Sequence, residues 1–172
     1  YIVQVALSAS GTLLATGHKN GAVSLWDAQT RRLLHPFASP FGETVLSLAF
    51  SPTEPLLATS DWVGNIVLYN TTTMEMVPPP LKAHSGRVTS LAFSPDGRTL
   101  ASAGEGGGLK LWHVATHQVA LTLKGHVGAV TGIAFSSDGT FMASCGVDGS
   151  VRLWPTVTIE EAGAATRPKE NQ

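Results

Sequence analysis

The stretch FSSDGTFMASCGVDGSVRLW, residues 135–154, is a near copy of FSPDGRTLASAGEGGGLKLW, residues 93–112, which stands 42 residues earlier. Two looser copies precede this pair. An aromatic residue closes each copy, at Trp26, Tyr69, Trp112 and Trp154. These aromatic residues are spaced by 43, 43 and 42 residues. A fixed period of this length predicts one structural unit built several times, so the repeat decides the architecture.

Each copy reads as short strands separated by turn residues. In the third copy the segments are RVTSLAFS (87–94), TLASAG (99–104), LKLWHV (109–114) and QVALTLK (118–124). Polar and apolar residues alternate along the first segment, and PDG and EGGG supply the turns after the first two. A four-stranded sheet buries its faces poorly when it stands alone, so successive sheets must stack, and radial stacking makes a propeller. We therefore expect an all-β fold.

The third and fourth copies carry the motifs of a known repeat. AH at 83–84 and GH at 125–126 precede FSPDG and FSSDG, and GGLKLW and GSVRLW close the two copies. In these motifs the chain resembles WD40 repeats, and the resemblance covers residues 1–157. It implies a WD40 β-propeller segment of four blades, each a four-stranded antiparallel sheet. The last blade lacks its outer strand, because the residues after LWPT show no apolar alternation.

The resemblance also sets the expected organisation. The repeats fall at 1–39, 40–81, 82–123 and 124–157, and 158–172 is a polar, flexible tail with one helical turn at IEEAGAA. WD40 propellers usually have about seven blades, the chain begins with Tyr1, and its FSPDG-type turns resemble those of bacterial WD40 proteins. We expect the C-terminal portion of a longer chain. An open arc that a partner or a second copy completes is the alternative.

In WD40 repeats a polar network links the His of GH, a hydroxyl of the second strand, an Asp of the next turn and the Trp of the third strand. The fourth copy has all of these, as His126, Ser144, Asp148 and Trp154. A sheltered Asp needs donors, so we interpret the set as structural and not as a catalytic triad. The third copy keeps His84, Ser102 and Trp112 but has Gly106 at the Asp position. The second copy keeps Thr59 but has Phe41, Val63 and Tyr69 at the other three positions. The first copy keeps Thr16 and Trp26 and has Asn20 at the Asp position.

Composition excludes several classes of protein. The formal net charge is −1 and the sequence shows no run of Lys and Arg, so we expect neither nucleic acid nor a membrane surface as partner. Cys145 is the only cysteine, which excludes an internal disulfide, and we expect a small buried strand residue. No apolar run is long enough to cross a bilayer, and the first residues lack the pattern of a signal peptide. A cytoplasmic location is expected.

The candidate catalytic and metal motifs are weak. His113 and His117 have the spacing of two helical metal ligands, but they fall across a strand-to-strand turn. The GEGGGLK stretch from Gly104 lacks the order of a phosphate-binding loop and no helix follows it. No nucleophile elbow or zinc-protease motif occurs. We expect no catalytic residue, no metal and no cofactor.

With catalytic and metal sites unsupported, the remaining function is the binding of partners on the protein surface. In WD40 proteins, partners meet the face formed by the turn before each third strand and by the start of each first strand. By position this gives Lys19, Trp62, Glu105 and Val147 from the turns, and Tyr1, Val3, Thr44, Leu46, Arg87, Thr89, Ala129 and Thr131 from the strands. Trp62 is the strongest candidate, because a Trp in a turn is of the type enriched at binding hot spots. Packing against a neighbouring loop is its alternative role.

Two functions stay open at this point. The first is a scaffold that binds protein or peptide partners on one face, with self-association to complete the propeller as a possibility. The second is the regulatory C-terminal propeller of a bacterial signalling enzyme, such as a serine/threonine kinase, whose catalytic domain lies upstream. Fold analogy alone does not choose between them.

Overall fold

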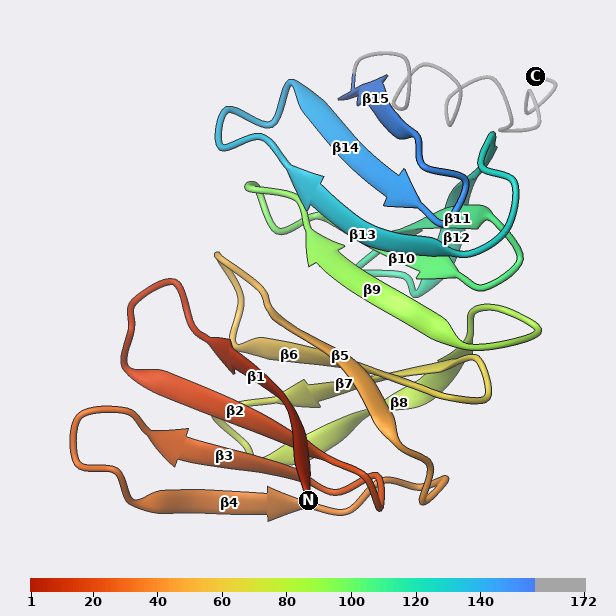
Figure 1. Cartoon of the computed structure of the whole chain (residues 1–172). Helices are drawn as coiled ribbons and strands as arrows, with labels where there is room; N and C mark the ends of the chain where they lie inside the picture. The colour runs from red at the N-terminus through yellow and green to blue at the C-terminus, as the bar shows by residue number, and fades with distance from the viewer. Residues whose placement is uncertain (157–172) are drawn as a thin grey trace, which may run out of the picture.

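The protein is represented by a computed structural model, which describes residues 1–156. The expected polar tail at 158–172 and its helical turn lie outside the described residues. Four antiparallel sheets follow one another along the chain and fan out in an arc (Figure 1). The predicted all-β, four-blade architecture is confirmed, and within the described residues the last blade has three strands, as predicted.

Each sheet takes its strands in sequence order, from the inner strand to the outer one. Blade one contains β1 (Ile2–Leu7), β2 (Leu13–His18), β3 (Val23–Asp27) and β4 (Leu33–Phe37). Blade two contains β5 (Val45–Phe50), β6 (Leu56–Asp61), β7 (Asn65–Asn70) and β8 (Glu75–Lys82). Blade three contains β9 (Val88–Phe93), β10 (Thr99–Gly104), β11 (Gly108–His113) and β12 (Gln118–Lys124). Blade four contains β13 (Val130–Phe135), β14 (Phe141–Gly146) and β15 (Val151–Pro155).

The FSPDG and FSSDG motifs form the turn between the first and second strands. In blade three the Ser94 hydroxyl donates to the Asp96 carboxylate at 2.5 Å, and the Arg98 amide donates to the same oxygen at 3.0 Å. Ser136 and Asp138 repeat the first contact at 2.6 Å in blade four. The short polar side chains thus satisfy the turn's amides locally, which explains why these residues end one strand and start the next.

The core lies between the blades and not within one sheet. Leu109 and Leu111 of β11 are fully buried, in a cluster that includes Val130 and Met142 of blade four. A second cluster joins Leu25 of blade one to Tyr69 of blade two. Each blade therefore supplies the surface that buries the third strand of the blade before it.

The two outermost faces of the described blades carry exposed apolar side chains. Val151 and Leu153 stand one period after Leu109 and Leu111, yet they are 71% and 67% exposed. On blade one, Val5 of β1 is 64% exposed. No described blade covers either face.

Cys145 departs from expectation. We predicted a buried strand residue, and the strand placement on β14 is correct, but the thiol-bearing residue is exposed. Cys145 lies opposite Val151 in the β14–β15 ladder, on the blade-four face that no described blade covers. The prediction of burial was wrong because it rested on how often a free Cys is buried, whereas no described blade covers this face.

Adjacent blades are also joined along their inner strands. The Leu91 amide of β9 donates to the Ser47 hydroxyl of β5 at 3.1 Å, and the Ile133 amide of β13 donates to the Ser90 hydroxyl of β9 at 3.2 Å. Ser47 and Ser90 stand one period apart. A serine at this place therefore joins blade two to blade three and blade three to blade four.

In blades one to three, the glycine before the third strand packs against the connector that leads into the next blade. Gly64 has φ +100°, its carbonyl accepts the Ala83 and His84 amides at 2.9 and 3.1 Å, and a Cβ there would overlap the His84 carbonyl oxygen. Gly149, at the same place in blade four, has φ +74° but no atom within 4 Å of an added Cβ. The two glycines share backbone strain and differ in packing.

Substitution at these two glycines separates the two effects. We expect Gly64→Ala to lower the free energy of unfolding by about 3 kcal/mol and Gly149→Ala by about 1 kcal/mol, because only the first displaces the next blade. Urea unfolding followed by tryptophan fluorescence measures both values. Equal losses would show that the glycines serve only their own turns.

Candidate functional site

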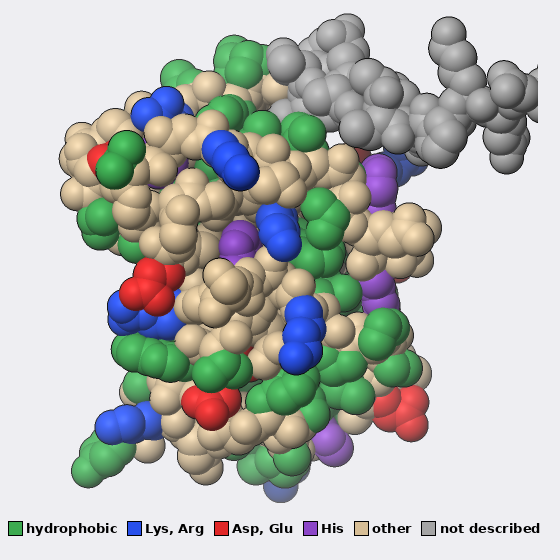
Figure 2. Space-filling model, turned by 90° about the vertical axis from the view of Figure 1, so that its right-hand side faces the viewer, with side chains coloured by type: hydrophobic (Ala, Val, Ile, Leu, Met, Phe, Trp, Pro, Cys, Tyr) green, Lys and Arg blue, Asp and Glu red, His purple; other side chains and the backbone are tan. Residues whose placement is uncertain are grey.

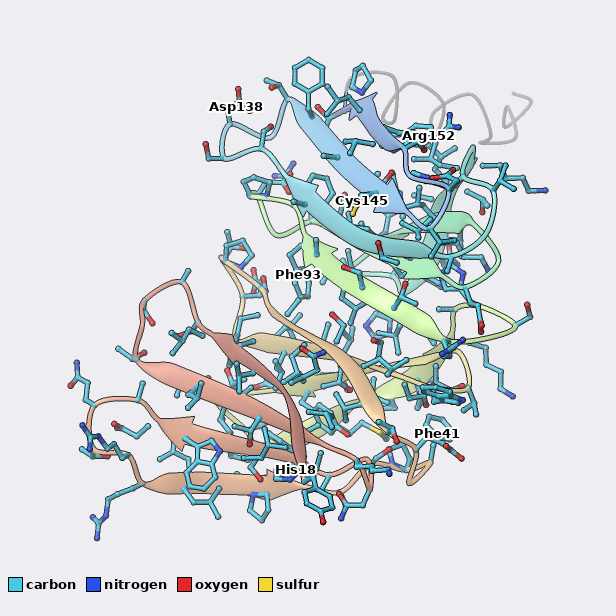
Figure 3. All side chains as sticks on the ribbon, viewed as in Figure 1. His18, Phe41, Phe93, Asp138, Cys145 and Arg152 are labelled. Atoms are coloured by element: carbon cyan, nitrogen blue, oxygen red, sulfur yellow. The ribbon has the colours of Figure 1, made fainter. Side chains whose placement is uncertain are left out.

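The turn residues and strand starts gather on one side of the arc, here called the upper face. It comprises the turns 19–21, 62–64, 105–107 and 147–149, and the connectors 40–44, 83–87 and 125–129. Figure 3 shows that Phe41, in a connector, and Asp138, in a first turn, lie at opposite ends of the blades. Figure 2 looks onto the upper face, where basic, acidic and hydrophobic side chains are interspersed.

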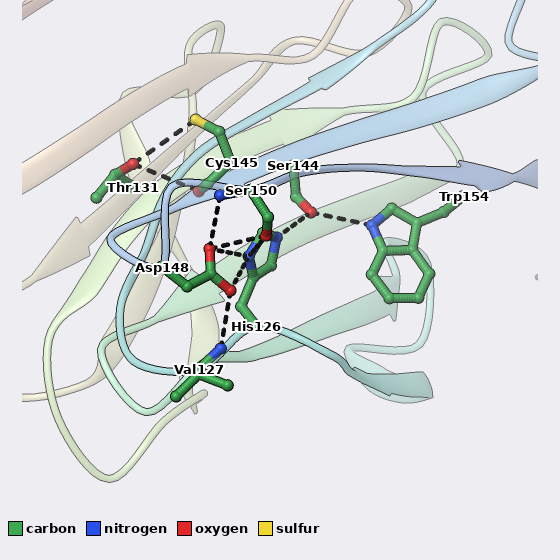
Figure 4. A network of polar contacts seen from close by, with 8 residues as sticks. All are labelled: His126, Val127, Thr131, Ser144, Cys145, Asp148, Ser150 and Trp154. Carbon is green, nitrogen blue, oxygen red and sulfur yellow. Dashed lines mark hydrogen bonds and ion pairs between the residues drawn. The ribbon is translucent and has the colours of Figure 1, made fainter.

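Blade four brings its network residues together (Figure 4). The Trp154 indole donates to Ser144 Oγ at 3.0 Å, Ser144 Oγ lies 2.8 Å from His126 Nε2, and His126 Nδ1 lies 3.1 Å from both carboxylate oxygens of Asp148. With the proton on Nδ1, the imidazole donates to Asp148 and accepts the Ser144 proton, so every group has a partner.

The Asp148 carboxylate also holds the connector that leads into blade four. The Val127 amide donates to it at 2.9 Å, and the Ser150 hydroxyl and amide donate at 2.8 and 3.0 Å. These donors, Val127 first and then Ser150 and His126, hold the pKa of Asp148 well below its usual range. The side chain is only 14% exposed. One carboxylate therefore ties connector, turn and second strand together.

Blade three keeps the chain of contacts but lacks the acid. His84 Nε2 lies 2.9 Å from Ser102 Oγ, and the Trp112 indole donates to that oxygen at 3.0 Å. Burial, and secondarily the Lys110 ammonium, lower the pKa of His84 to about 4. Because Gly106 stands where blade four has Asp148, no carboxylate from this turn offsets these effects, and with a pKa of about 4 His84 is neutral at pH 7.

Blade one builds the network from another histidine. The Trp26 indole donates to Thr16 Oγ1 at 3.0 Å, and His18 Nε2 lies 3.3 Å from Thr16 Oγ1 and from Ser24 Oγ. His18 stands at the place in the repeat where blade two has Asp61 and where blades three and four have Gly104 and Gly146. The sequence analysis did not single out His18, although a His two residues after the strand hydroxyl was a usable signal.

In blade two the acidic residue that accepts the turn amides is Asp61. Thr59 donates to the Val67 carbonyl at 3.4 Å, and the blade has Tyr69 in place of the indole. Asp61, which is 6% exposed, accepts the Val63 and Asn65 amides at 3.0 and 2.8 Å and the Asn65 side-chain amide at 2.7 Å. Asp61 and Asn65 were also missed, because they lie outside the family's usual positions.

Trp62 follows Asp61 in this turn and is 48% exposed. The Arg87 guanidinium carbon of blade three lies 4.3 Å from the centroid of its ring, and Arg87 forms an ion pair with Glu105. The pairing holds the pKa of Glu105 below its usual range. Three of the predicted partner residues thus form one contiguous group that spans two blades.

Several other predicted partner residues use their polar groups within the fold. Thr44 donates to the Lys19 carbonyl at 2.9 Å, Thr89 donates to the carbonyls of Ala103 and Val130, and Thr131 donates to the Cys145 carbonyl at 3.4 Å. Leu46 is half-buried. Lys19 and Val147 are exposed, and so are Tyr1 and Val3, whereas Ala129 is half-buried.

Leu46, Thr89 and Thr131 share a structural cause. The pairing of first and second strands skips one residue at each of these places, as it does at Val3. The extra residue is left out of the ladder, and its side chain is directed by the bulge and not by the alternation of the strand. Position in the repeat alone did not reveal this.

The opposite side of the arc has a groove of about 1150 Å³ between blades two and three, lined among others by Glu54, Val77, Arg98, His113 and His117. Within residues 1–156, no three His, Cys, Asp or Glu residues are placed to hold a metal ion. Nor does that part of the chain contain a helix long and apolar enough to cross a membrane.

Comparison with known proteins places the repeat. The family model described as "WD domain, G-beta repeat" matches residues 1–27, 32–70, 78–113 and 117–155. Among solved structures, a chain in "Crystal Structure of Mitotic Checkpoint Complex" superposes with a TM-score of 0.84 at 25% identity. The match covers 92% of this chain and 48% of that one, so this chain spans about half the length of its structural neighbour. Among curated proteins the comparison found no match.

The role of Asp148 can be tested through stability. We expect Asp148→Ala to lower the melting temperature by several degrees, because the Val127 and Ser150 amides and His126 lose their acceptor. The melting temperature of Asp148→Asn, which keeps one side-chain oxygen as an acceptor, should lie between that of Asp148→Ala and that of the wild type. Differential scanning calorimetry measures all three, and an unchanged melting temperature in Asp148→Ala would contradict a structural role.

The missing acid of blade three predicts a pH dependence. The pKa of His84 is about 4 in the folded protein and 6.5 in an unfolded chain, so the unfolded state binds the proton first. Stability is complete above pH 6.5 and should fall by roughly 2 kcal/mol as the pH drops to 4.

Gly106→Asp should reduce this loss. An added Cβ at Gly106 meets no atom within 4 Å, and an Asp there would place a carboxylate near His84, at the place that Asp148 has in blade four, where it would stabilise the protonated imidazole. Urea unfolding at several pH values, with Gly106→Asn as the uncharged control, measures the difference. The same pH slope in both variants would show that His84 does not cause it.

Proposed function

Because the chain belongs to the WD40 repeat family, we propose that it is a scaffold that binds protein or peptide partners on its upper face, with Trp62 as the anchor. The observation that carries this proposal is the group of Trp62, Arg87 and Glu105, which combines a large exposed ring with fixed charges. WD40 propellers typically act as platforms for protein assembly.

The anchor is held rigidly before any partner arrives. Asp61 fixes the backbone that follows Trp62 by accepting the amides of Val63 and Asn65. Arg87 stacks on the ring, and Glu105 in turn restrains Arg87. A side chain that is already ordered loses little conformational entropy on binding, so more of its contact energy appears as affinity.

The surroundings of the ring suit a mixed contact. Val63 is 48% exposed and Phe41, in the connector of the same blade, is 39% exposed. Apolar side chains thus accompany the ring, while the Arg87–Glu105 pair offers both signs of charge. An aromatic anchor with a polar rim is the composition typical of protein interfaces.

The network residues do not support an enzyme. In blade four the Ser144 hydroxyl already bonds the indole and the imidazole, so it has no free geometry for attack on a substrate. The structural neighbour comes from a complex, which agrees with a role in assembly. No observation favours the alternative of a kinase-linked regulatory propeller, and we do not propose it.

The proposal predicts a separation of binding from stability. Trp62→Ala should remove the specific partners that the wild-type chain captures from its native extract, while the free energy of unfolding changes by less than about 1 kcal/mol. Quantitative mass spectrometry of the captured proteins measures the first effect, and urea unfolding the second.

Phe141→Ala is the matched control. Phe141 is 45% exposed, much like Trp62, but it lies at the far end of the blades, next to the turn that holds Asp138. The Phe141→Ala variant should capture the same partners as the wild type. If Trp62→Ala keeps the same partners, Trp62 is not the anchor. A large loss of stability in this variant would show that the ring packs within the fold.

A further inference from the structure

Val127 and Val147 are the most exposed aliphatic side chains of the upper face. Val127, in the connector that leads into blade four, is 79% exposed, and Val147, in the turn before β15, is 64% exposed. A Cβ placed on Gly128 would be 2.8 Å from Cγ2 of Val147, and the Val147 amide donates to the Ala129 carbonyl at 2.9 Å. The turn thus lies against the connector directly after Val127, and the two side chains are here called the valine pair.

The exposure of the valine pair does not arise from the absence of a further described blade. In blades two and three, each of which is followed by another blade, Trp62 and Glu105 stand at the place of Val147. Trp62 is 48% exposed and the Glu105 side chain is 43% exposed. Ser85, at the place of Val127 in blade three, is also exposed. A following blade therefore leaves this part of the upper face open, unlike the face that carries Val151.

An aspartate fixes the backbone at each apolar part of the upper face. Asp148 accepts the Val127 amide at 2.9 Å and the Ser150 amide at 3.0 Å, so it ties the connector to the turn (Figure 4). Asp61 likewise accepts two amides of the turn that contains Trp62. Side chains on a backbone that is already ordered lose less conformational entropy when a partner binds. The valine pair is therefore held in place as firmly as the ring.

Blades one and three lack exposed apolar side chains in the same turn. Blade one has Lys19 and Asn20 there, and blade three has Glu105 and Gly106. The two blades that present apolar residues before their third strands are thus the two in which an aspartate accepts the amides of that turn. This coincidence links the acid of each turn to the surface that the turn presents.

Polar groups connect the two apolar parts without a break. Trp62 is in contact with Arg87, and Arg87 pairs with Glu105 in the turn of blade three. The same turn packs on the connector that carries Val127, because a Cβ placed on Gly107 would be 2.5 Å from the carbonyl oxygen of the residue before Val127. The upper face therefore has an apolar part, an ion pair and a second apolar part in succession.

We propose that the valine pair is a second anchor for the partner that binds at Trp62, and that this partner contributes an extended segment with two apolar side chains separated by polar, uncharged residues. One apolar side chain packs on the ring of Trp62 and the other on the valine pair. This proposal rests on the proposed function and specifies the chemistry of the partner.

The surface between the two anchors determines the rest of the segment. Arg87 and Glu105 already neutralise each other, so a charged residue above them would meet both an attractive and a repulsive group. Polar uncharged residues avoid that repulsion. An amphipathic helix presents a continuous apolar stripe, which would place apolar side chains on the ion pair. An extended segment with separated apolar residues fits the surface better.

The test begins with a phage-displayed library of random peptides selected on the 172-residue chain. We expect the selected peptides to share two apolar positions at one fixed separation. The best of them is labelled with fluorescein, and its binding is measured by fluorescence anisotropy. Val127→Ser/Val147→Ser should bind this peptide about tenfold more weakly than the wild type does, and so should Trp62→Ala, because each removes one apolar contact. Selected peptides with a single shared apolar position would overturn the proposal.

The separation of the two apolar positions gives a second readout. Extra glycines between them should weaken binding to the wild type, because the effective concentration of the second side chain at its anchor falls. The lengthened peptide should bind Val127→Ser/Val147→Ser as well as the original peptide does, since that variant has lost the second anchor. If lengthening leaves binding to the wild type unchanged, one segment does not occupy both anchors and the proposal falls.

Val151→Ser/Leu153→Ser is the matched control. These two side chains are 71% and 67% exposed, much like the valine pair, but they lie on the blade-four face that no described blade covers. This variant should bind the peptide as the wild type does. An equal loss in both double variants would show general hydrophobic adhesion, and a loss in the control alone would place the peptide on the other face. Either result would overturn the proposal.

Failure of this proposal is distinguishable from failure of the proposed function. If Trp62→Ala loses its captured partners while Val127→Ser/Val147→Ser binds the peptide normally, the scaffold function stands and the second anchor falls. If only Val127→Ser/Val147→Ser loses the peptide, the valine pair is confirmed as a binding surface and Trp62 is misassigned. Urea unfolding should give the wild-type stability for both double variants, because all four side chains are exposed.

Discussion

Burial of each third strand by the following blade is the constraint on which the rest of the structure depends. Leu109 and Leu111 are fully buried because blade four lies on them, while their counterparts Val151 and Leu153 are open. Each leucine of this size contributes about 2 kcal/mol when it leaves water. In a single blade these side chains would be exposed to water, so each blade needs the next one to bury them. This stacking in turn determines where the turns and connectors lie.

The polar networks have a narrower task, which is to pair the buried polar groups around the turn before each third strand. Asp148 joins the Val127 amide to the turn, whereas blade one substitutes His18 and blade two uses Asp61. Three different solutions, with His18 and Asp61 at one position of the repeat and Asp148 two residues further on, show that the architecture does not require one set of residues. What the fold requires is that buried donors and acceptors be paired, and any side chain within reach can supply the partner.

The period of the aromatic residues, together with the strand pattern inside each copy, predicted the blades, because hydrophobic stacking repeats wherever the sequence repeats. The short last sheet was predicted from the loss of apolar alternation after LWPT. The predicted positions of Trp62, Arg87 and Glu105 also came from the repeat. Thr44 and Thr89 show where this reasoning ends: their hydroxyls bond carbonyls of neighbouring strands, and Thr89 stands at a bulge. Contacts between residues far apart in sequence depend on geometry that a one-dimensional pattern does not contain. The exposure of Cys145 depends likewise on what covers its blade.

The same geometry explains why contacts between blades are hidden in the sequence. A residue of a connector and a residue on the next blade's third strand meet only because the connector crosses from one blade to the other. Arg152 therefore lies against Gly125, with 3.1 Å between its Nη1 atom and the place of a Cβ on Gly125, although 27 positions separate the two residues. Stacking that buries the apolar third strands thus also determines which polar side chains meet where one blade joins the next.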